Sequence, residues 1–110
     1  MRGVRREPAM SLTVSVIICC YTQERLQDIG DAVASVRRQT RPADEIIVAV
    51  DSNPDLYECL GSDFGEPMKV VLNAGVKGLS ATRNVGIAAA RGDLVAFLDD
   101  DAVAEADWLA

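Results

Sequence analysis

An almost unbroken apolar stretch near the start of the chain reads Val14-Ser15-Val16-Ile17-Ile18-Cys19-Cys20. Most of its residues are β-branched, and the apolar residues occupy successive positions rather than alternate ones. This pattern is typical of a strand that is covered on both faces, as the strands of parallel sheets are. Cys19 and Cys20 lie inside the stretch, and we interpret both as small buried hydrophobic side chains.

The period of the pattern changes directly after this strand. Apolar residues now recur with the spacing of one helical face, at Leu26, Ile29, Val33 and Val36. Arg37 and Arg38 follow, in what would be the last turn, where positive charge suits the helix dipole. The sequence therefore predicts an amphipathic helix that begins near Glu24.

The remainder of the chain continues this alternation. We expect strands over residues 45–50, 69–72 and 94–98, a helix over 79–90, a short helical piece around 56–60, a loop over 61–67, and the start of a further helix before Trp108. Alternating strands and helices predict an α/β fold, a doubly wound and mostly parallel sheet with helices on both faces. Such sheets bind ligands at the carboxyl ends of their strands, where the strand order reverses.

Length and composition limit the kind of protein. The 110 residues suffice for one small domain, which we place at residues 12–110. Residues 1–11 are polar and basic without periodicity, so we expect them to form a disordered tail. The formal net charge of -6 disfavours nucleic acid as a partner, because an acidic chain repels phosphate backbones.

The histidine and cysteine content and the length of the apolar runs also limit the chemistry and the location of the protein. The chain has no histidine, which rules out histidine bases and histidine metal ligands within it. Three cysteines without a regular framework favour a reducing compartment. No apolar run reaches the roughly 18 residues that a membrane span needs, and no signal peptide is evident. We therefore expect a cytoplasmic location, or one at the inner face of the membrane.

Polar residues follow every predicted strand except the third. Asp51 ends the second strand, and Asp99-Asp100-Asp101 follows the fourth. Because the carboxyl ends of parallel strands share one edge, these acids should converge in space, where like charges repel. A divalent cation relieves that repulsion, and Mg²⁺ prefers one or two carboxylates together with the phosphates of a substrate. The sequence therefore suggests a site for a metal ion and a diphosphate.

Each of these residues also has a simpler interpretation. Thr22 could cap the following helix, with Glu24 as an acid in its first turn. Asp51 could be a turn residue before Pro54, and the three aspartates could form a solvated loop. Arg83 could belong to a solvated helix face, although an arginine in the first turns of a helix is equally suited to grip a phosphate.

Four segments together resemble glycosyltransferase family 2, whose fold is the GT-A fold. They are the strand and polar end at 14–22, the strand at 45–52, the segment Gly78-Leu79-Ser80-Ala81-Thr82-Arg83-Asn84-Val85-Gly86, and Gly92–Asp101 leading into an Asp-x-Asp motif. Each segment alone is weak, but their order over residues 14–109 is specific. The resemblance implies the nucleotide-sugar-binding, Rossmann-like half of a GT-A domain, in a hexosyltransferase of cell-wall or polysaccharide biosynthesis.

The resemblance also implies roles for individual residues. Tyr21, Thr22 and Glu24 would line the nucleotide pocket, Asp51 would accept a hydrogen bond from the base, which suits uracil, and Arg83 would contact the diphosphate. Asp99 and Asp100 would contact ribose or sugar, and Asp101, with Asp99, would bind Mg²⁺ or Mn²⁺. The donor would be a UDP-sugar, and the acceptor a saccharide or a lipid-linked molecule.

Two departures from the family pattern matter. Many members carry a further acid after the Asp-x-Asp motif, where this chain has Ala102. The chain also stops at Ala110, whereas family members continue into an acceptor region that carries a carboxylate base. We therefore expect a truncated or partial protein with no catalytic residue of its own, which binds a donor weakly and does not transfer the sugar alone.

Three alternatives remain open. Residues 94–103 also fit the motif of haloacid dehalogenase-type phosphatases, in which Asp99 would be the nucleophile and Asp101 an acid/base. That motif usually lies on the first strand, however, and three strands precede it here. A sugar-phosphate nucleotidyltransferase would need a glycine-rich loop after the first strand, and residues 20–24 contain no glycine. An inactive remnant is the third alternative.

Overall fold

The sheet of this protein is entirely parallel. The computed structural model describes residues 12–63 and 68–110, so the tail expected at residues 1–11 lies outside the described residues. Within these residues the four strands are β1 (Val14–Cys20), β2 (Glu45–Asp51), β3 (Met68–Asn73) and β4 (Leu94–Asp99), in the order β3-β2-β1-β4. This order confirms the predicted doubly wound α/β fold, since the chain builds outward from β1 in one direction and then returns to its other side.

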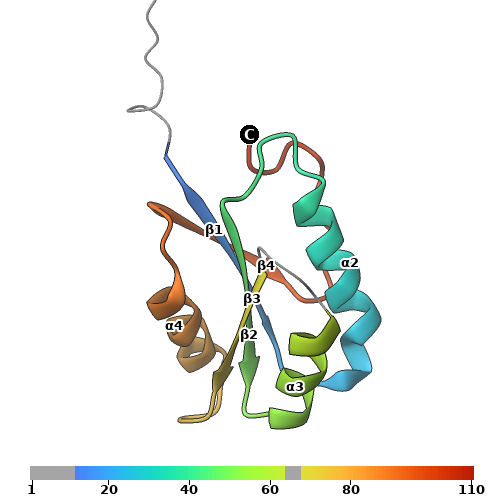
Figure 1. The fold of residues 1–110 in the computed structure, drawn as a ribbon, viewed down its shortest axis with the longest axis vertical. Coiled ribbons are helices and arrows are strands. Elements are labelled where there is room, and N and C mark those ends of the chain that lie inside the picture. Colours follow the sequence, from blue (N-terminus) through green and yellow to red (C-terminus); the bar gives the residue numbers. More distant parts are fainter. Residues whose placement is uncertain (1–11, 64–67) are drawn as a thin grey trace, which may run out of the picture.

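Helices cover both faces of the sheet (Figure 1). α2 (Leu26–Arg37) follows the short 3-10 helix η1 (Gln23–Arg25), and it lies beside α3 (Pro54–Asp63) on one face. α4 (Leu79–Ala89) lies on the other. Within residues 12–63 and 68–110, no helix is long and apolar enough to cross a membrane.

The core divides along the alternation of β1. Val16 and Ile18 face the layer of α2 and α3, where Ile29, Val33, Leu56 and Leu60 are fully or almost fully buried. Ile17 points the other way, into a smaller cluster on the α4 side. β1 and β2 are therefore covered on both faces, as the continuous apolar sequence of β1 predicts.

β4 does not have the burial that its apolar sequence suggests. Leu94, Val95 and Phe97 are all exposed, with 39% of Phe97 accessible. The reason is position, because β4 is an edge strand and pairs only with β1 among the described strands. The apolar run at residues 94–98 thus correctly predicted a strand, but it did not show that the strand would lie at an edge of the sheet.

Two further expectations need correction. α3 extends from Pro54 to Asp63, so residues 61–63 are helical where a loop was expected, and residues 64–67 lie outside the described residues. Pro54 suits the first helical turn, and the Asn53 side chain accepts a hydrogen bond from the Leu56 N–H at 3.1 Å. The helix expected before Trp108 is wrong, because residues 106–109 form turns.

The C-terminal segment is instead fastened to the end of α2. The Gln39 amide donates to the Glu105 carbonyl at 2.6 Å and accepts from the Leu109 N–H at 2.8 Å. The Thr40 N–H donates to the Ala106 carbonyl at 2.8 Å. These long-range bonds satisfy backbone groups that a helix would otherwise have paired locally.

The close approach of α4 to the sheet depends on Gly86. A Cβ at this position would lie 2.8 Å from a methyl group of the buried Ile17, whereas a Cβ at Gly30 in α2 would meet nothing within 4 Å. We expect Gly86→Ala to lower the free energy of unfolding by about 1–3 kcal/mol through overpacking. Gly30→Ala should raise it by about 0.5–1 kcal/mol. Urea unfolding of both variants tests these two expectations. Equal changes in the free energy of unfolding would contradict the close packing of Gly86 against Ile17.

The amino end of the sheet contains a carboxylate with a lowered pKa. Burial of Glu45 opposes its charge, but hydrogen bonds from the Arg91 N–H, the Ser15 hydroxyl and Lys69 outweigh burial and lower its pKa. A lowered folded-state pKa contributes stability that is present above the unfolded value and is lost as pH falls through the folded one.

We therefore expect Glu45→Gln to unfold at lower urea than the unaltered chain at pH 7. The difference should shrink once the pH falls below about 4.3, the ordinary pKa of a glutamate. Glu105→Gln changes an exposed glutamate and should show no such difference at any pH. A gap for Glu45→Gln that stays constant down to pH 2 would contradict the assignment.

Candidate functional site

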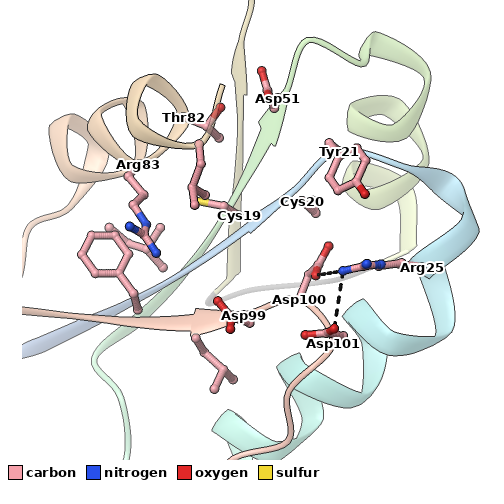
Figure 2. Close-up of a pocket in the computed structure, with 14 residues that line it drawn as sticks. Cys19, Cys20, Tyr21, Arg25, Asp51, Thr82, Arg83, Asp99, Asp100 and Asp101 are labelled. Atoms are coloured by element: carbon pink, nitrogen blue, oxygen red, sulfur yellow. Dashed lines mark hydrogen bonds and ion pairs between the residues drawn. The ribbon is translucent and has the colours of Figure 1, made fainter. Parts of the chain in front are cut away.

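A cavity of about 360 Å³ opens at the carboxyl ends of the strands. Residues of β1, β2 and β4, together with the first turns of α4, line it. It lies beside the boundary between β1 and β4, where the strand order reverses, and this is where doubly wound sheets bind ligands. Figure 2 shows the side chains that surround it.

Most of the sequence-predicted site residues meet in this cavity. Its lining includes Tyr21, Asp51, Arg83, Asp99, Asp100 and Asp101. Thr22 and Glu24 are not among the lining residues; the Thr22 hydroxyl instead accepts the Glu24 N–H at 3.2 Å and caps η1. The topology therefore joins residues that lie up to 80 positions apart in the chain, as the shared edge of a parallel sheet requires.

The three consecutive aspartates occupy different environments. Asp100 is buried, and its Oδ1 accepts a hydrogen bond from Arg25 Nη1 at 2.9 Å. The carboxylate of Asp101 lies 3.6 Å from the same nitrogen and is 54% exposed. Asp99, the last residue of β4, is also exposed. The chain thus turns one carboxylate inward and leaves two accessible from the cavity.

Arg25 is the functional candidate that the sequence did not reveal. Its guanidinium bridges Asp100 and Asp101 and lies 5.8 Å from the centre of the Tyr21 ring (Figure 2). The hydrogen bond and charge of Asp100 raise the pKa of Arg25 further above its already high value. An internal cation therefore compensates part of the acidic cluster. Its sequence signal was weak, because the partner carboxylate lies 75 residues away.

The second oxygen of Asp100 is unusual. Asp100 Oδ2 is buried and has no hydrogen-bond partner among the described residues. A buried acceptor without a partner costs roughly 1–3 kcal/mol, and such groups need an explanation in each case. This oxygen can still accept a donor or a cation at the cavity wall.

Arg83 approaches the cavity from α4. Its guanidinium carbon lies 5.2 Å from the centre of the exposed Phe97 ring on β4, a cation–π contact. The contact places a second cation across the cavity from Arg25 (Figure 2). Arg83 therefore belongs to the cavity rather than to a purely solvated helix face.

Asp51 is held by several donors at the end of β2. Gly78 N–H donates to its Oδ2 at 3.0 Å, and the Ser52 hydroxyl donates to its Oδ1 at 3.1 Å. The Asn73 amide lies 3.4 Å from the same Oδ1. The strand expected over residues 69–72 extends to Asn73 in the structure, so β3 ends on a polar residue, as β2 and β4 do.

The two adjacent cysteines are poor ligands and nucleophiles. Burial raises the pKa of Cys20 to about 12, with a contribution from Asp100. Burial also raises the pKa of Cys19 to about 11, although Arg83 opposes the shift. Both thiols are therefore protonated near neutral pH, in keeping with their interpretation as small buried side chains, even though Cys19 is half-buried at the cavity wall.

A cation at this site would have to use few protein ligands. In the part of the chain that the structure describes, no three cysteine or acidic side chains gather closely enough to hold a metal ion by themselves. Mg²⁺ does not require such a cage, because it usually takes one or two carboxylates and completes its shell with phosphate and water. The exposed carboxylates of Asp99 and Asp101 fit that smaller requirement.

Relatives of this chain share its sequence over most of its length. It is 39% identical over 100 residues to the glucosyl-dolichyl phosphate glucuronosyltransferase of Haloferax volcanii, covering 89% of this chain and 32% of that protein. It is 31% identical over 98 residues to the UDP-Glc:alpha-D-GlcNAc-diphosphoundecaprenol beta-1,3-glucosyltransferase of Escherichia coli, covering 88% and 36%. The chain thus spans about a third of the length of these relatives.

The family match spans the sheet and the cavity together. Residues 15–110 match the family described as Glycosyl transferase family 2. The match includes β1, β2 and β3, the three strands that the phosphatase alternative left unexplained. With the parallel sheet and the cavity at its carboxyl edge, this match establishes that the chain belongs to glycosyl transferase family 2.

Proposed function

We propose that this chain binds the donor of a sugar-transfer reaction, a nucleoside diphosphate sugar, together with a divalent cation. The observation that carries the proposal is the cavity, where Asp51, Arg83 and the three aspartates converge from β2, α4 and β4. A nucleoside diphosphate sugar needs a polar contact for its base, cations for its phosphates and acceptors for its hydroxyls. The cavity lining supplies all three kinds of group.

We assign the base and the phosphates to opposite parts of the cavity. Asp51 would accept the N3–H of uracil, so the donor would be a UDP-sugar. Arg83 would contact the diphosphate as a guanidinium, which matches phosphate oxygens well. Tyr21, with 56% of its surface exposed at the end of β1, would cover the nucleoside.

We assign Mg²⁺ or Mn²⁺ to Asp101 and Asp99. Arg25 pairs closely with Asp100 and contacts Asp101 only at 3.6 Å, so the two exposed carboxylates would be open to a cation and to the sugar hydroxyls. A bound divalent cation takes up negative charge that develops on the leaving nucleoside diphosphate. Asp99 and Asp101 would hold and orient the phosphates through it, and Arg83 would add a fixed positive charge.

The relatives suggest an acceptor and a place. One relative is named for a dolichyl phosphate substrate and another for a diphosphoundecaprenol substrate. We therefore propose a lipid-linked saccharide as the acceptor of the whole enzyme, with the reaction at the cytoplasmic face of a membrane. Donor binding is the part that we assign to the described residues, and we assign no catalytic base among them.

Calorimetric titration of the chain with UDP tests the donor site. We expect UDP to bind in the presence of Mn²⁺ and to lose most of its affinity when EDTA replaces the metal. Asp101→Asn should weaken binding at least tenfold, or by about 1.4 kcal/mol, because a neutral amide is a poorer ligand for a hard cation. Asp107→Asn, which alters an exposed acid away from the cavity lining, is the matched control.

Two results would contradict this assignment. Equal affinity for UDP with Mn²⁺ and with EDTA would remove the metal from the proposal. Equal affinity of the unaltered chain and Asp101→Asn, with Mn²⁺ still required, would move the metal to another carboxylate.

A further inference from the structure

Asn73 is a buried polar residue close to the cavity residue Asp51. It ends β3 directly opposite Asp51 in the parallel register, and only 4% of its surface is accessible. Buried polar side chains are retained where they are hydrogen-bonded, and their bonds fix what surrounds them.

The hydrogen bonds of Asn73 determine which way its amide points. Its Nδ2 donates to the Val76 carbonyl at 2.8 Å and to the Thr82 hydroxyl oxygen at 3.1 Å. Its Oδ1 accepts from the Gly75 N–H at 3.1 Å. The reversed amide would face a carbonyl with its oxygen and an N–H with its own NH₂, so only one orientation satisfies the partners.

These bonds close the loop between β3 and α4 and thereby place Gly78. Gly78 has a φ of 133°, a conformation that side-chain-bearing residues rarely adopt. The Thr82 hydroxyl donates to the Gly78 carbonyl at 2.8 Å, and the Gly78 N–H donates to Asp51 Oδ2 at 3.0 Å. The amino end of α4, which favours negative charge, therefore holds the Asp51 carboxylate.

A second bond from β3 fixes the other side of Asp51. The Ser52 N–H donates to the Asn73 carbonyl at 2.9 Å, and Ser52 adopts a left-handed φ of 52°. This conformation is uncommon for a residue other than glycine. It lets the Ser52 hydroxyl reach Asp51 Oδ1. Asn73 thus helps to hold both oxygens of the Asp51 carboxylate. Its side chain places Gly78, which donates to Oδ2, and its backbone carbonyl binds Ser52, which donates to Oδ1.

The hydrogen bonds to Asp51 leave its carboxylate with few free acceptor positions. An ionised carboxylate has about four acceptor positions, and Gly78 and Ser52 direct donors at two of them. The Asn73 amide, whose two hydrogens already point at Val76 and Thr82, adds a weaker contact with Oδ1 at 3.4 Å. Asp51 also lines the cavity, so a ligand in the cavity can reach what remains. A carboxylate that is held in this way discriminates between ligands that present an N–H and ligands that present an acceptor.

We infer that Asn73 is a positioning residue for base selection: it fixes Asp51 so that the cavity favours a pyrimidine with an N3–H over one with an unprotonated N3. This inference rests on the proposed contact between Asp51 and the base. Uracil carries the N3–H, whereas N3 of cytosine is an acceptor that would face the carboxylate. Asn73 itself need not touch the ligand.

Titrations with UDP and CDP in the presence of Mn²⁺ test the inference. We expect the unaltered chain to prefer UDP by at least tenfold. Asn73→Ala should reduce the preference to within about threefold and leave the affinity for Mn²⁺ and inorganic pyrophosphate unchanged. Thr82→Val, which removes one partner of Asn73 while keeping the side-chain shape, should reduce the preference partly, and it serves if Asn73→Ala does not fold.

The controls separate positioning from general stability. Asn84→Ala alters an exposed asparagine of α4 and should keep the full preference. A merely structural role for Asn73 predicts that UDP, CDP and pyrophosphate all weaken together at a constant ratio, and that result would overturn the inference. An unchanged preference in Asn73→Ala, or in Thr82→Val where that variant has to serve, would overturn it as well.

The variant Asp51→Asn separates the role of Asn73 from the proposed contact between Asp51 and the base. If Asp51→Asn loses the preference while Asn73→Ala keeps it, the base contact stands and the role of Asn73 falls. If Asp51→Asn retains the preference, the base contact at Asp51 is wrong and both fall together. If the unaltered chain binds UDP no better than CDP, both fall as well.

Discussion

The pairing of β1 on both of its edges is the constraint on which the rest of this structure depends. β1 pairs with β2 through residues 15–20 and with β4 through residues 14–19, in the same direction on both sides. A parallel partner can be reached only by a crossover, so the chain must pass over one face of the sheet to reach β2 and over the other to reach β4. The crevice at the carboxyl end of β1 is the geometric result.

That crevice concentrates acidic residues, and the fold compensates them individually. Arg25 pairs with the buried Asp100, while the amino end of α4 and its loop hold Asp51. Asp99 and Asp101 are exposed, and the 3.6 Å contact of Asp101 with Arg25 is the looser of the two contacts made by that arginine. Because a like-charge cluster is costly unless opposite charge is near, the two accessible carboxylates are the ones that gain most from an added cation.

Much of this could be predicted from the sequence because it depends on local periodicity. The apolar run of β1 and the helical stripe of α2 identify their elements without knowledge of any partner, and the polar ends of parallel strands identify the edge where Asp51 and Asp101 meet. Arg25 and Asn73 could not be found in this way. Their importance comes from partners that are distant in sequence or from a loop whose shape no spacing reveals. The turns around Trp108 were missed for the same reason, since Gln39 holds that segment from another element.

The two sides of the cavity differ in how far their polar groups already have hydrogen-bond partners, and the difference follows from the position of their strands in the sheet. β2 lies between two strands and under helices on both faces, and Asp51 at its end already accepts hydrogen bonds from Gly78 and Ser52. β4 is an edge strand with exposed side chains, and the Asp100 carboxylate beside it retains a buried oxygen without a partner. Groups that are held before a ligand arrives lose little freedom on binding, whereas loosely held groups must be ordered by it. Under the proposed function, the side that faces the base is therefore preorganised for recognition, and the side that faces the phosphates becomes complete only when the cation and the diphosphate supply the charges that it lacks.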